Sequence, residues 1–302
     1  MSTSVVSAIF EVIATASDLL NITVKGGKKM LKYLVVLIIL VVLIVIYSVW
    51  SFNRQAGREI EALFIQPAAE SSFIEPDMLN DLPAPVQRWL TYSGVVGREV
   101  IQTVYLKQTG EMKLNPDQEK WIKSEAEQSF NAIQPQFIWR VSTSMFGLPV
   151  VGRDDYNDGQ GKMLIKLVGL IPVVNLGGNQ NLSESTMQRY LGEIIWFPTA
   201  ALSPYITWEP IDDVSAKATM EYAGIKGSAT FYFDQNGKPV RVLIPRYRDV
   251  NDLEPTDWEA EITEFEQLNG LMIPVKGEAS WLLEDGKFTW YRFSVHGVRY
   301  NP

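Results

Sequence analysis

The sequence predicts an α+β protein, mainly β, in which one N-terminal transmembrane helix precedes a strongly curved antiparallel sheet, a half-barrel or clam, with two short helices packed on it. Three observations support this prediction. Residues 33–53 form an apolar run without a charged side chain. From Glu99 onward, polar and apolar residues alternate in about a dozen segments, as they do in half-buried strands. Asp158-Gly159 and Asn236-Gly237 separate neighbouring segments, and such pairs favour tight hairpin turns.

The length and charge of the chain limit its organisation and its partners. Of the 302 residues, the anchor and a linker occupy the first fifth, which leaves about 220 for one larger β domain. Residues 54–302 carry 23 basic and 33 acidic side chains. This negative field repels phosphate backbones, so we expect no nucleic-acid partner. The absence of cysteine excludes disulfides, thiolate metal sites and cysteine nucleophiles.

The apolar run has the length and character of a membrane span. Its 21 residues, from Tyr33 to Asn53, extend roughly 30 Å as a helix, which matches the hydrocarbon core of a bilayer. Leu, Val and Ile occupy every face, so a buried helix of a soluble domain is the weaker alternative. Tyr47 and Trp50 lie towards one end, where amphipathic rings favour the headgroup region. We therefore expect the lipid bilayer to be a partner through residues 33–53.

The charges that flank this run predict its orientation. Four lysines precede it, whereas the two arginines that follow it are accompanied by Glu59 and Glu61. The positive-inside bias then places the N-terminus in the cytoplasm and the large domain outside the cell membrane. Bulky residues at 46–50 stand where a signal peptidase requires small ones. We therefore predict an uncleaved signal anchor over residues 30–53.

The N-terminal extension, residues 1–29, has two interpretations. Residues 25–30 read Lys-Gly-Gly-Lys-Lys-Met, which can be encoded by a purine-rich ribosome-binding sequence placed suitably before a start codon at Met30. On this interpretation the native chain begins at Met30 and the start has been misassigned. The alternative is an amphipathic helix on the membrane surface, with one apolar face formed by Val5, Ile9, Val12, Ile13 and Leu20.

Beyond the anchor, we expect a juxtamembrane helix and linker over residues 54–80 and an extracytoplasmic β-rich domain over residues 81–302. Two short helices interrupt the strand pattern of this domain. The second of them is predicted to begin at Ser185, with Gln188 completing a capping box, and to end before Pro198. Antiparallel strands account for the rest of the domain.

Four motifs stand out in this domain: LPAPVQRWL at 82–90, YSGVVG at 92–97, WFPTA at 196–200 and SATF at 228–231. Together they resemble an uncharacterised bacterial membrane-anchored family that is known only as a domain of unknown function. The resemblance implies no catalytic residue, because the family has no established activity. More remotely, the late strands and the DQNGKP turn at 234–239 are similar to periplasmic lipoprotein-carrier domains, in which a curved sheet surrounds an apolar cavity. This second similarity implies a half-barrel but establishes no function.

A candidate binding site is centred on the most apolar segment, residues 163–174. The segment is either a central strand covered on both faces or a wall of a hydrophobic cavity. A curved sheet around a helix can enclose either a filled core or a lipid pocket. In the second case the predicted lining residues are Leu167, Leu191, Ile195, Trp196, Phe197 and Trp208. The predicted ligand is a lipid or another apolar small molecule.

An acidic cluster is the alternative site. Its members are Asp154, Glu209, Asp212 and Asp213, which would supply paired carboxylates for hydrolysis if they converged. The sequence contains a single histidine, His296, and neither a phosphate-binding loop nor a nucleophile elbow. We therefore predict no metal site, no cofactor and no catalytic residue.

These observations leave three hypotheses for the function. We expect a membrane-tethered extracytoplasmic binding module for an apolar or lipid-like ligand, without chemistry of its own. The first alternative is a carboxylate-dependent hydrolase of envelope material, and the second is a structural or partner-binding envelope protein. A ligand in the interior would favour the binding module, and convergent acids in a polar cleft would favour the hydrolase. A dry packed core would favour the structural or partner-binding protein.

Overall fold

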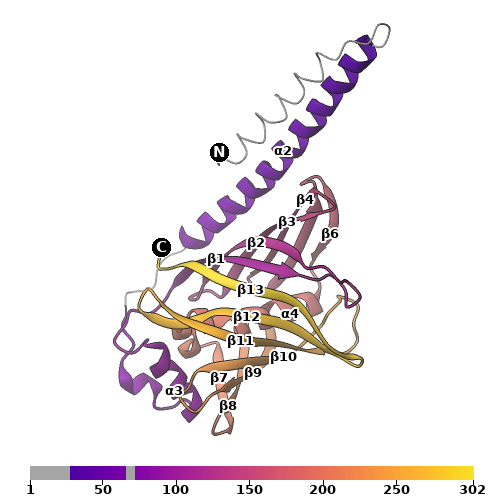
Figure 1. The fold of residues 1–302 in the computed structure, drawn as a ribbon. Coiled ribbons are helices and arrows are strands. Elements are labelled where there is room, and N and C mark those ends of the chain that lie inside the picture. Colours follow the sequence, from indigo (N-terminus) through magenta and orange to yellow (C-terminus); the bar gives the residue numbers. More distant parts are fainter. Residues whose placement is uncertain (1–27, 66–71) are drawn as a thin grey trace.

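A computed structural model describes residues 28–65 and 72–302, and shows one long helix leading away from a curved sheet (Figure 1). The long helix, α2, covers Lys28–Ile65. A short 3₁₀ helix, η1 (Pro76–Leu79), and the helix α3 (Ala84–Ser93) follow it. Gly94 ends α3 in the left-handed conformation that glycine adopts without strain.

Within the described residues, thirteen strands form one antiparallel sheet in two meanders. The first meander contains β1 (Thr103–Met112), β2 (Ile122–Asn131), β3 (Gln136–Met145), β4 (Leu148–Asn157), β5 (Gln160–Leu167) and β6 (Ile171–Gly177). The second contains β7 (Ile206–Asp212), β8 (Ser215–Tyr222), β9 (Ile225–Phe233), β10 (Pro239–Arg246), β11 (Thr256–Leu268), β12 (Leu271–Leu283) and β13 (Gly286–Tyr300). β1 pairs with β13, which joins the two meanders, while β6 and β7 form the two edges of the sheet.

The period-two pattern decides which face of the sheet is buried. In β9, for example, Ala229, Phe231 and Phe233 are buried, and the residues between them are more exposed. A sheet with one apolar face must cover that face, and here it curves around a helix. The predicted fold class is therefore confirmed: the protein is mainly β, and its curved sheet remains open.

The helix α4 (Gln180–Glu193) covers the concave face. It connects the two edge strands and packs against β4 and β5 on one side and β8–β10 on the other. Two 3₁₀ helices, η2 (Ile194–Trp196) and η3 (Pro198–Leu202), continue from its end into the core. Tyr190 and Leu191 of α4 are fully buried, so the interior beside this helix is packed with side chains.

The prediction that this helix begins at Ser185 is wrong. The side chain of Asn179 caps the helix instead, by accepting a hydrogen bond from the backbone N–H of Leu182 at 3.1 Å. The Ser185 hydroxyl bonds the backbone of Tyr247, with the carbonyl oxygen at 3.2 Å. Asparagine and serine are comparable caps, and the tertiary contact of Ser185 could not be read from local sequence.

Of the two interpretations of residues 163–174, the central strand covered on both faces is wrong. The segment forms the β5–β6 hairpin at an edge of the sheet, with its turn at Val168-Gly169. Both turn residues have positive φ, 49° for Val168 and 72° for Gly169. The apolar composition of the segment therefore requires a different explanation.

The first part of α2 has the length and composition of a membrane span, a test that a signal sequence near an N-terminus would also meet. Its last turns pack on the outer face of the sheet, where Ile60 and Leu63 contact Ile138 of β3. The two interpretations of residues 1–29 concern a segment that lies almost entirely outside the described residues.

Candidate functional site

The helix α4 carries two charged side chains into the interior of the half-barrel. Arg189 and Glu193 lie one turn apart on the same face and form an ion pair of 2.9 Å. The guanidinium of Arg189 also binds the carboxylate of Asp154 on β4, at 2.5 Å. Asp154 is only 5% exposed. One arginine therefore neutralises two carboxylates in an interior that water scarcely reaches.

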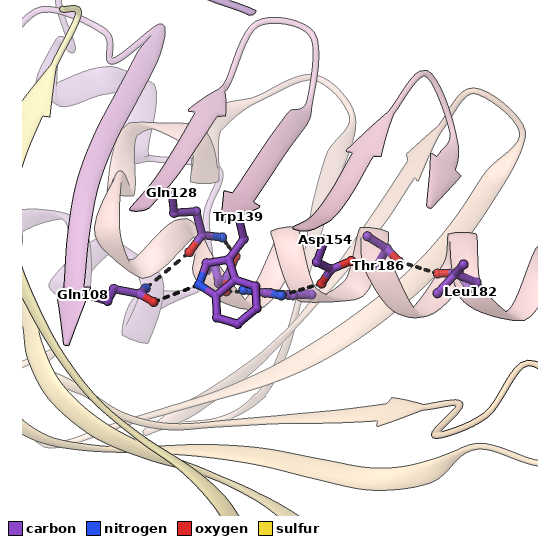
Figure 2. Close-up of polar contacts among 8 residues, drawn as sticks. Gln108, Gln128, Trp139, Asp154, Leu182 and Thr186 are labelled. Atoms are coloured by element: carbon purple, nitrogen blue, oxygen red, sulfur yellow. Dashed lines mark hydrogen bonds and ion pairs between the residues drawn. The ribbon is translucent and has the colours of Figure 1, made fainter. Parts of the chain in front are cut away.

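Amide side chains extend this network across the inner face of the sheet (Figure 2). Gln128 on β2 donates to Glu193 at 2.7 Å, and Gln108 on β1 donates to Gln128 at 3.3 Å. The indole N–H of Trp139 on β3 donates to Gln108 at 3.1 Å. We call Asp154, Arg189, Glu193, Gln128, Gln108 and Trp139 the polar network.

Burial and ion pairing shift the pKa values of the charged residues in this network in opposite directions. Burial alone would lower the pKa of Arg189, but Glu193 and Asp154 reverse that effect and raise it above the usual value. Burial raises the pKa of Glu193, and Arg189 and Gln128 offset only part of this. The arginine also stacks on Trp139, with 4.9 Å between the guanidinium carbon and the ring centre. Arg189 is therefore fully engaged by the network.

A second arginine beside the network has no counter-ion in contact. Arg246 ends β10, and its guanidinium lies over the ring of Trp258, 5.2 Å from the ring centre. Within the described residues its side chain forms neither an ion pair nor a hydrogen bond, and its Nε is buried. Burial, together with repulsion from Arg189, lowers the pKa of Arg246 to about 10, and Asp154 and Glu193 compensate only in part. Arg246 is therefore charged at neutral pH and has no direct partner in the part of the chain that the structure describes.

Aromatic side chains line the sheet next to Arg246. Trp258, Trp281 and Phe288 are directly opposite one another on β11, β12 and β13, so they share the inner face. A bulge in β13 adds Trp290, whose ring stacks on Tyr291 at 5.3 Å. We call Trp258, Trp281, Phe288, Trp290 and Tyr291 the aromatic wall.

Several buried polar atoms of this region have no hydrogen-bond partner among the described residues. They include the indole nitrogens of Trp258 and Trp290, Nε of Arg246 and Oδ1 of Asp154. Native proteins pair nearly all of their buried donors and acceptors, because an unpaired one costs about 1–3 kcal/mol. Among the described residues, Arg246 and the adjacent Trp258 therefore offer unpartnered donors on the concave face.

The structure places five of the six predicted lining residues in or against the main core. Leu191, Ile195, Trp196 and Phe197 are buried, and the indole N–H of Trp196 donates to the carbonyl of Pro274 at 3.2 Å. Trp208 on β7 packs on Phe231, with ring centres 5.1 Å apart. Leu167 lies away from them, at the end of β5 beside the hairpin turn.

The predicted acidic residues do not lie together in the structure. Asp154 faces the interior, whereas Glu209, Asp212 and Asp213 are exposed on β7 and in the following turn. Asp212 accepts the backbone N–H of Val214 at 2.9 Å, and this bond is the main reason why its pKa is lowered. The side chain of Asp212 thus stabilises a turn.

An open depression of about 750 Å³ lies mainly on the outer face, across β1–β3 and β11–β13. Its charged residues take part in two ion pairs within the described chain: Arg292 pairs with Glu278 at 2.8 Å, and Lys276 pairs with Glu264, outside the lining, at 2.8 Å. The depression is also lined by Glu111, Lys123 and Glu125.

The sequence interpretation missed the polar network and Arg246, although a signal was present. Gln108 follows Val104 and Leu106 in the inward register of β1, and Arg246 follows Val242 and Ile244 in β10. A polar residue at an inward position of an alternating strand is unusual and requires a partner. The same rule applies to Gln128 and Asp154.

A family model described as a family of unknown function, DUF6544, matches residues 72–293. The chain belongs to this family. The resemblance read from the four motifs is thereby confirmed. No curated protein matches the sequence.

Several solved structures are similar to this chain at low sequence identity. A LolA-superfamily protein from Nitrosomonas europaea is 9% identical with a TM-score of 0.39, over 71% of this chain and 91% of that one. A β-barrel-like protein of the domain of unknown function DUF1849 from Brucella abortus is 11% identical with a TM-score of 0.21, over 67% and 98%. The ywiB protein of Bacillus subtilis is 6% identical with a TM-score of 0.17, over 64% and 89%.

Proposed function

We propose that this protein is a membrane-tethered extracytoplasmic module that binds an amphipathic, lipid-like molecule with an anionic group. The anionic group would contact Arg246, and the apolar part would lie along the aromatic wall. The single observation that supports this proposal is a charged guanidinium that has no counter-ion in contact among the described residues. It lies over the ring of Trp258, whose indole N–H has no partner there either. An anion at this position would accept from Arg246 and from the adjacent indole N–H of Trp258.

The composition of the wall supports a ligand with a long apolar part. Trp258 and Trp281 present large flat surfaces, and each methylene of an acyl chain buried against them contributes about 0.8 kcal/mol. Trp281 and Phe288 are only partly buried, so this part of the inner face can be reached from solvent. A tether beside the bilayer would bring such a site within reach of lipids.

The carboxylates of the interior favour binding over hydrolysis. Asp154 and Glu193 are the acids whose charges raise the pKa of Arg246, and both are bound to Arg189. A general acid or nucleophile must instead be free to reach the substrate. The proposal therefore assigns no reaction to the site.

Substitution Arg246→Leu tests the site. We expect the full chain, purified in detergent, to retain an anionic lipid in native mass spectra. The variant should bind this lipid at least about tenfold more weakly, because a charge-assisted hydrogen bond contributes about 1.5–3 kcal/mol. Oleate tests for a carboxylate ligand and phosphatidylglycerol for an anionic phosphate ligand. Phosphatidylcholine, which has no net charge, is the comparison for both.

The matched control is Arg299→Leu. Arg299 is exposed on the outer face and also stacks on an aromatic ring, that of Tyr105 at 4.5 Å. This variant removes the same charge and should leave lipid retention unchanged. Equal retention by wild type and Arg246→Leu would contradict the proposal.

The orientation of the tether is the second part of the proposal. The lysines before the apolar run favour a cytoplasmic N-terminus and an extracytoplasmic sheet. Protease added to intact spheroplasts should therefore degrade the sheet domain and spare the N-terminal segment. Protection of the sheet domain would reverse this orientation.

A further inference from the structure

Two neighbouring hairpin tips expose apolar side chains beside α2. Phe146, in the β3–β4 turn, is 97% exposed. Leu148, Leu170, Ile171 and Val173 are exposed by 47–57%. The stretches 141–152 and 167–183, which include these tips, contain no charged residue. Contiguous exposed apolar groups of this kind mark a contact surface.

The turns themselves do not require these residues. In the described part of the chain, the positive-φ pairs that end in glycine are Phe146-Gly147, Asp158-Gly159, Val168-Gly169, Ala223-Gly224 and Asn269-Gly270. Aspartate and asparagine suit this conformation, whereas a β-branched valine is strained in it. Only the two tips beside α2 place bulky apolar residues there. Their apolar character therefore needs a reason outside the turn.

The two tips are joined to each other and to α2. The backbone N–H of Val168 donates to the carbonyl of Pro149 at 2.7 Å, which links the β5–β6 tip to the β3–β4 hairpin. The hydroxyl of Ser48 in α2 donates to the carbonyl of Val168 at 3.1 Å. A Cβ on Gly169 would lie 2.7 Å from the backbone nitrogen of Val49, so only glycine allows this approach.

This contact lies within the apolar run of α2. Ser48 precedes Asn53, the end of the run, by five residues, which corresponds to about 8 Å along a helix. Figure 1 shows the tips of β3–β6 rising beside the middle part of α2. If α2 spans a bilayer, the end of its apolar run marks the boundary between acyl chains and headgroups. The hairpin tips then extend past this boundary, to the side of the acyl chains.

Polar contacts further along α2 hold the sheet at this position along the helix axis. Arg140 on β3 donates to the carbonyl of Asn53 at 3.0 Å, and Arg153 on β4 forms an ion pair with Glu59. These charged groups lie beyond the end of the apolar run, where headgroups and water can solvate them. Along α2, the apolar tips thus lie at the position expected for the acyl chains. The charged contacts lie at the position expected for the headgroups.

We propose that the β3–β4 and β5–β6 hairpin tips insert into the acyl-chain boundary of the leaflet from which α2 emerges. Phe146 and Ile171 would enter the lipid, which removes their exposed apolar surface from water. The partner is the bilayer itself, because the surface continues the apolar face of α2. This inference rests on the membrane anchoring proposed above but is independent of the ligand site.

Single cysteines test this insertion, because the natural chain has none. The variants Phe146→Cys and Ile171→Cys, labelled with an environment-sensitive dye, are compared in nanodiscs of phosphatidylcholine with and without doxyl lipids. Asp158→Cys is the aqueous control, since this exposed turn lies at the other end of β4, about 30 Å away. Val41→Cys within the apolar run of α2 is the lipid control.

Quenching by doxyl lipid and protection from aqueous iodide at positions 146 and 171, as at position 41, would support insertion. Two other results would overturn it: iodide quenching at both tips as at position 158, or protection from both quenchers, which would indicate a protein interface. If position 41 itself escapes the lipid quencher, the membrane anchoring fails, and insertion fails with it. That result is distinguishable because it concerns a different position.

Discussion

Replacing Arg189 with methionine should lower the free energy of unfolding by about 3–5 kcal/mol, because it leaves buried charges without their partner. Among the described residues, Arg189 is the only direct counter-ion of Asp154 and Glu193, and the variant would remove it. Methionine keeps much of the side-chain volume, so the loss reports on charge rather than on a cavity. Denaturant unfolding of the full chain in detergent, followed by tryptophan fluorescence, measures this difference.

The matched control removes all three charges together. Arg189→Met combined with Asp154→Asn and Glu193→Gln leaves no unpaired charge within the polar network itself, so most of the lost stability should return. If Arg189→Met alone changed stability by less than about 1 kcal/mol, the polar network would be far better solvated than its burial indicates.

Replacing Trp196 with alanine should destabilise the protein by about 3–5 kcal/mol, as truncation of a buried tryptophan typically does. Its ring lies 5.7 Å from that of Phe293 and 6.4 Å from that of Phe130. The variant would also leave the carbonyl of Pro274 without the indole donor. The same unfolding measurement in detergent applies.

Trp281→Ala is the matched control for this variant. Trp281 is the same residue type but is only partly buried, on the aromatic wall, so its loss should cost about 1 kcal/mol. For lipid retention the order should be reversed: Trp281→Ala should lose more bound lipid than Trp196→Ala. A larger destabilisation by Trp281→Ala than by Trp196→Ala would contradict this division into core and wall.

The fold was largely predictable because its main determinants are local. Alternation in strands such as β9, and the pair Asp158-Gly159, indicate antiparallel hairpins without any knowledge of the tertiary structure. The start of α4 was not predictable, since Ser185 is used by a contact with Tyr247 that is distant in sequence. The pairing of β1 with β13, which joins the two meanders, is likewise a long-range contact.

The candidate site was less predictable than the fold. Apolar residues such as Trp196 and Phe197 were selected for their hydrophobicity, and hydrophobicity is shared by cores and pockets alike. What distinguishes them is whether each polar atom has a partner, as for Trp196, or lacks one, as for Trp258. That distinction depends on residues from several strands and so appears only in three dimensions.

The most direct test of a lipid-like ligand on the aromatic wall is photo-crosslinking of the full chain in nanodiscs with a diazirine-labelled fatty acid or phospholipid. Mass spectrometry then locates the modified peptides. Our account predicts crosslinks on β11–β13, at Trp258, Trp281 or Trp290, that an excess of unlabelled anionic lipid displaces. Crosslinks confined to α2 and the hairpin tips, with none on the inner face of β11–β13, would contradict it.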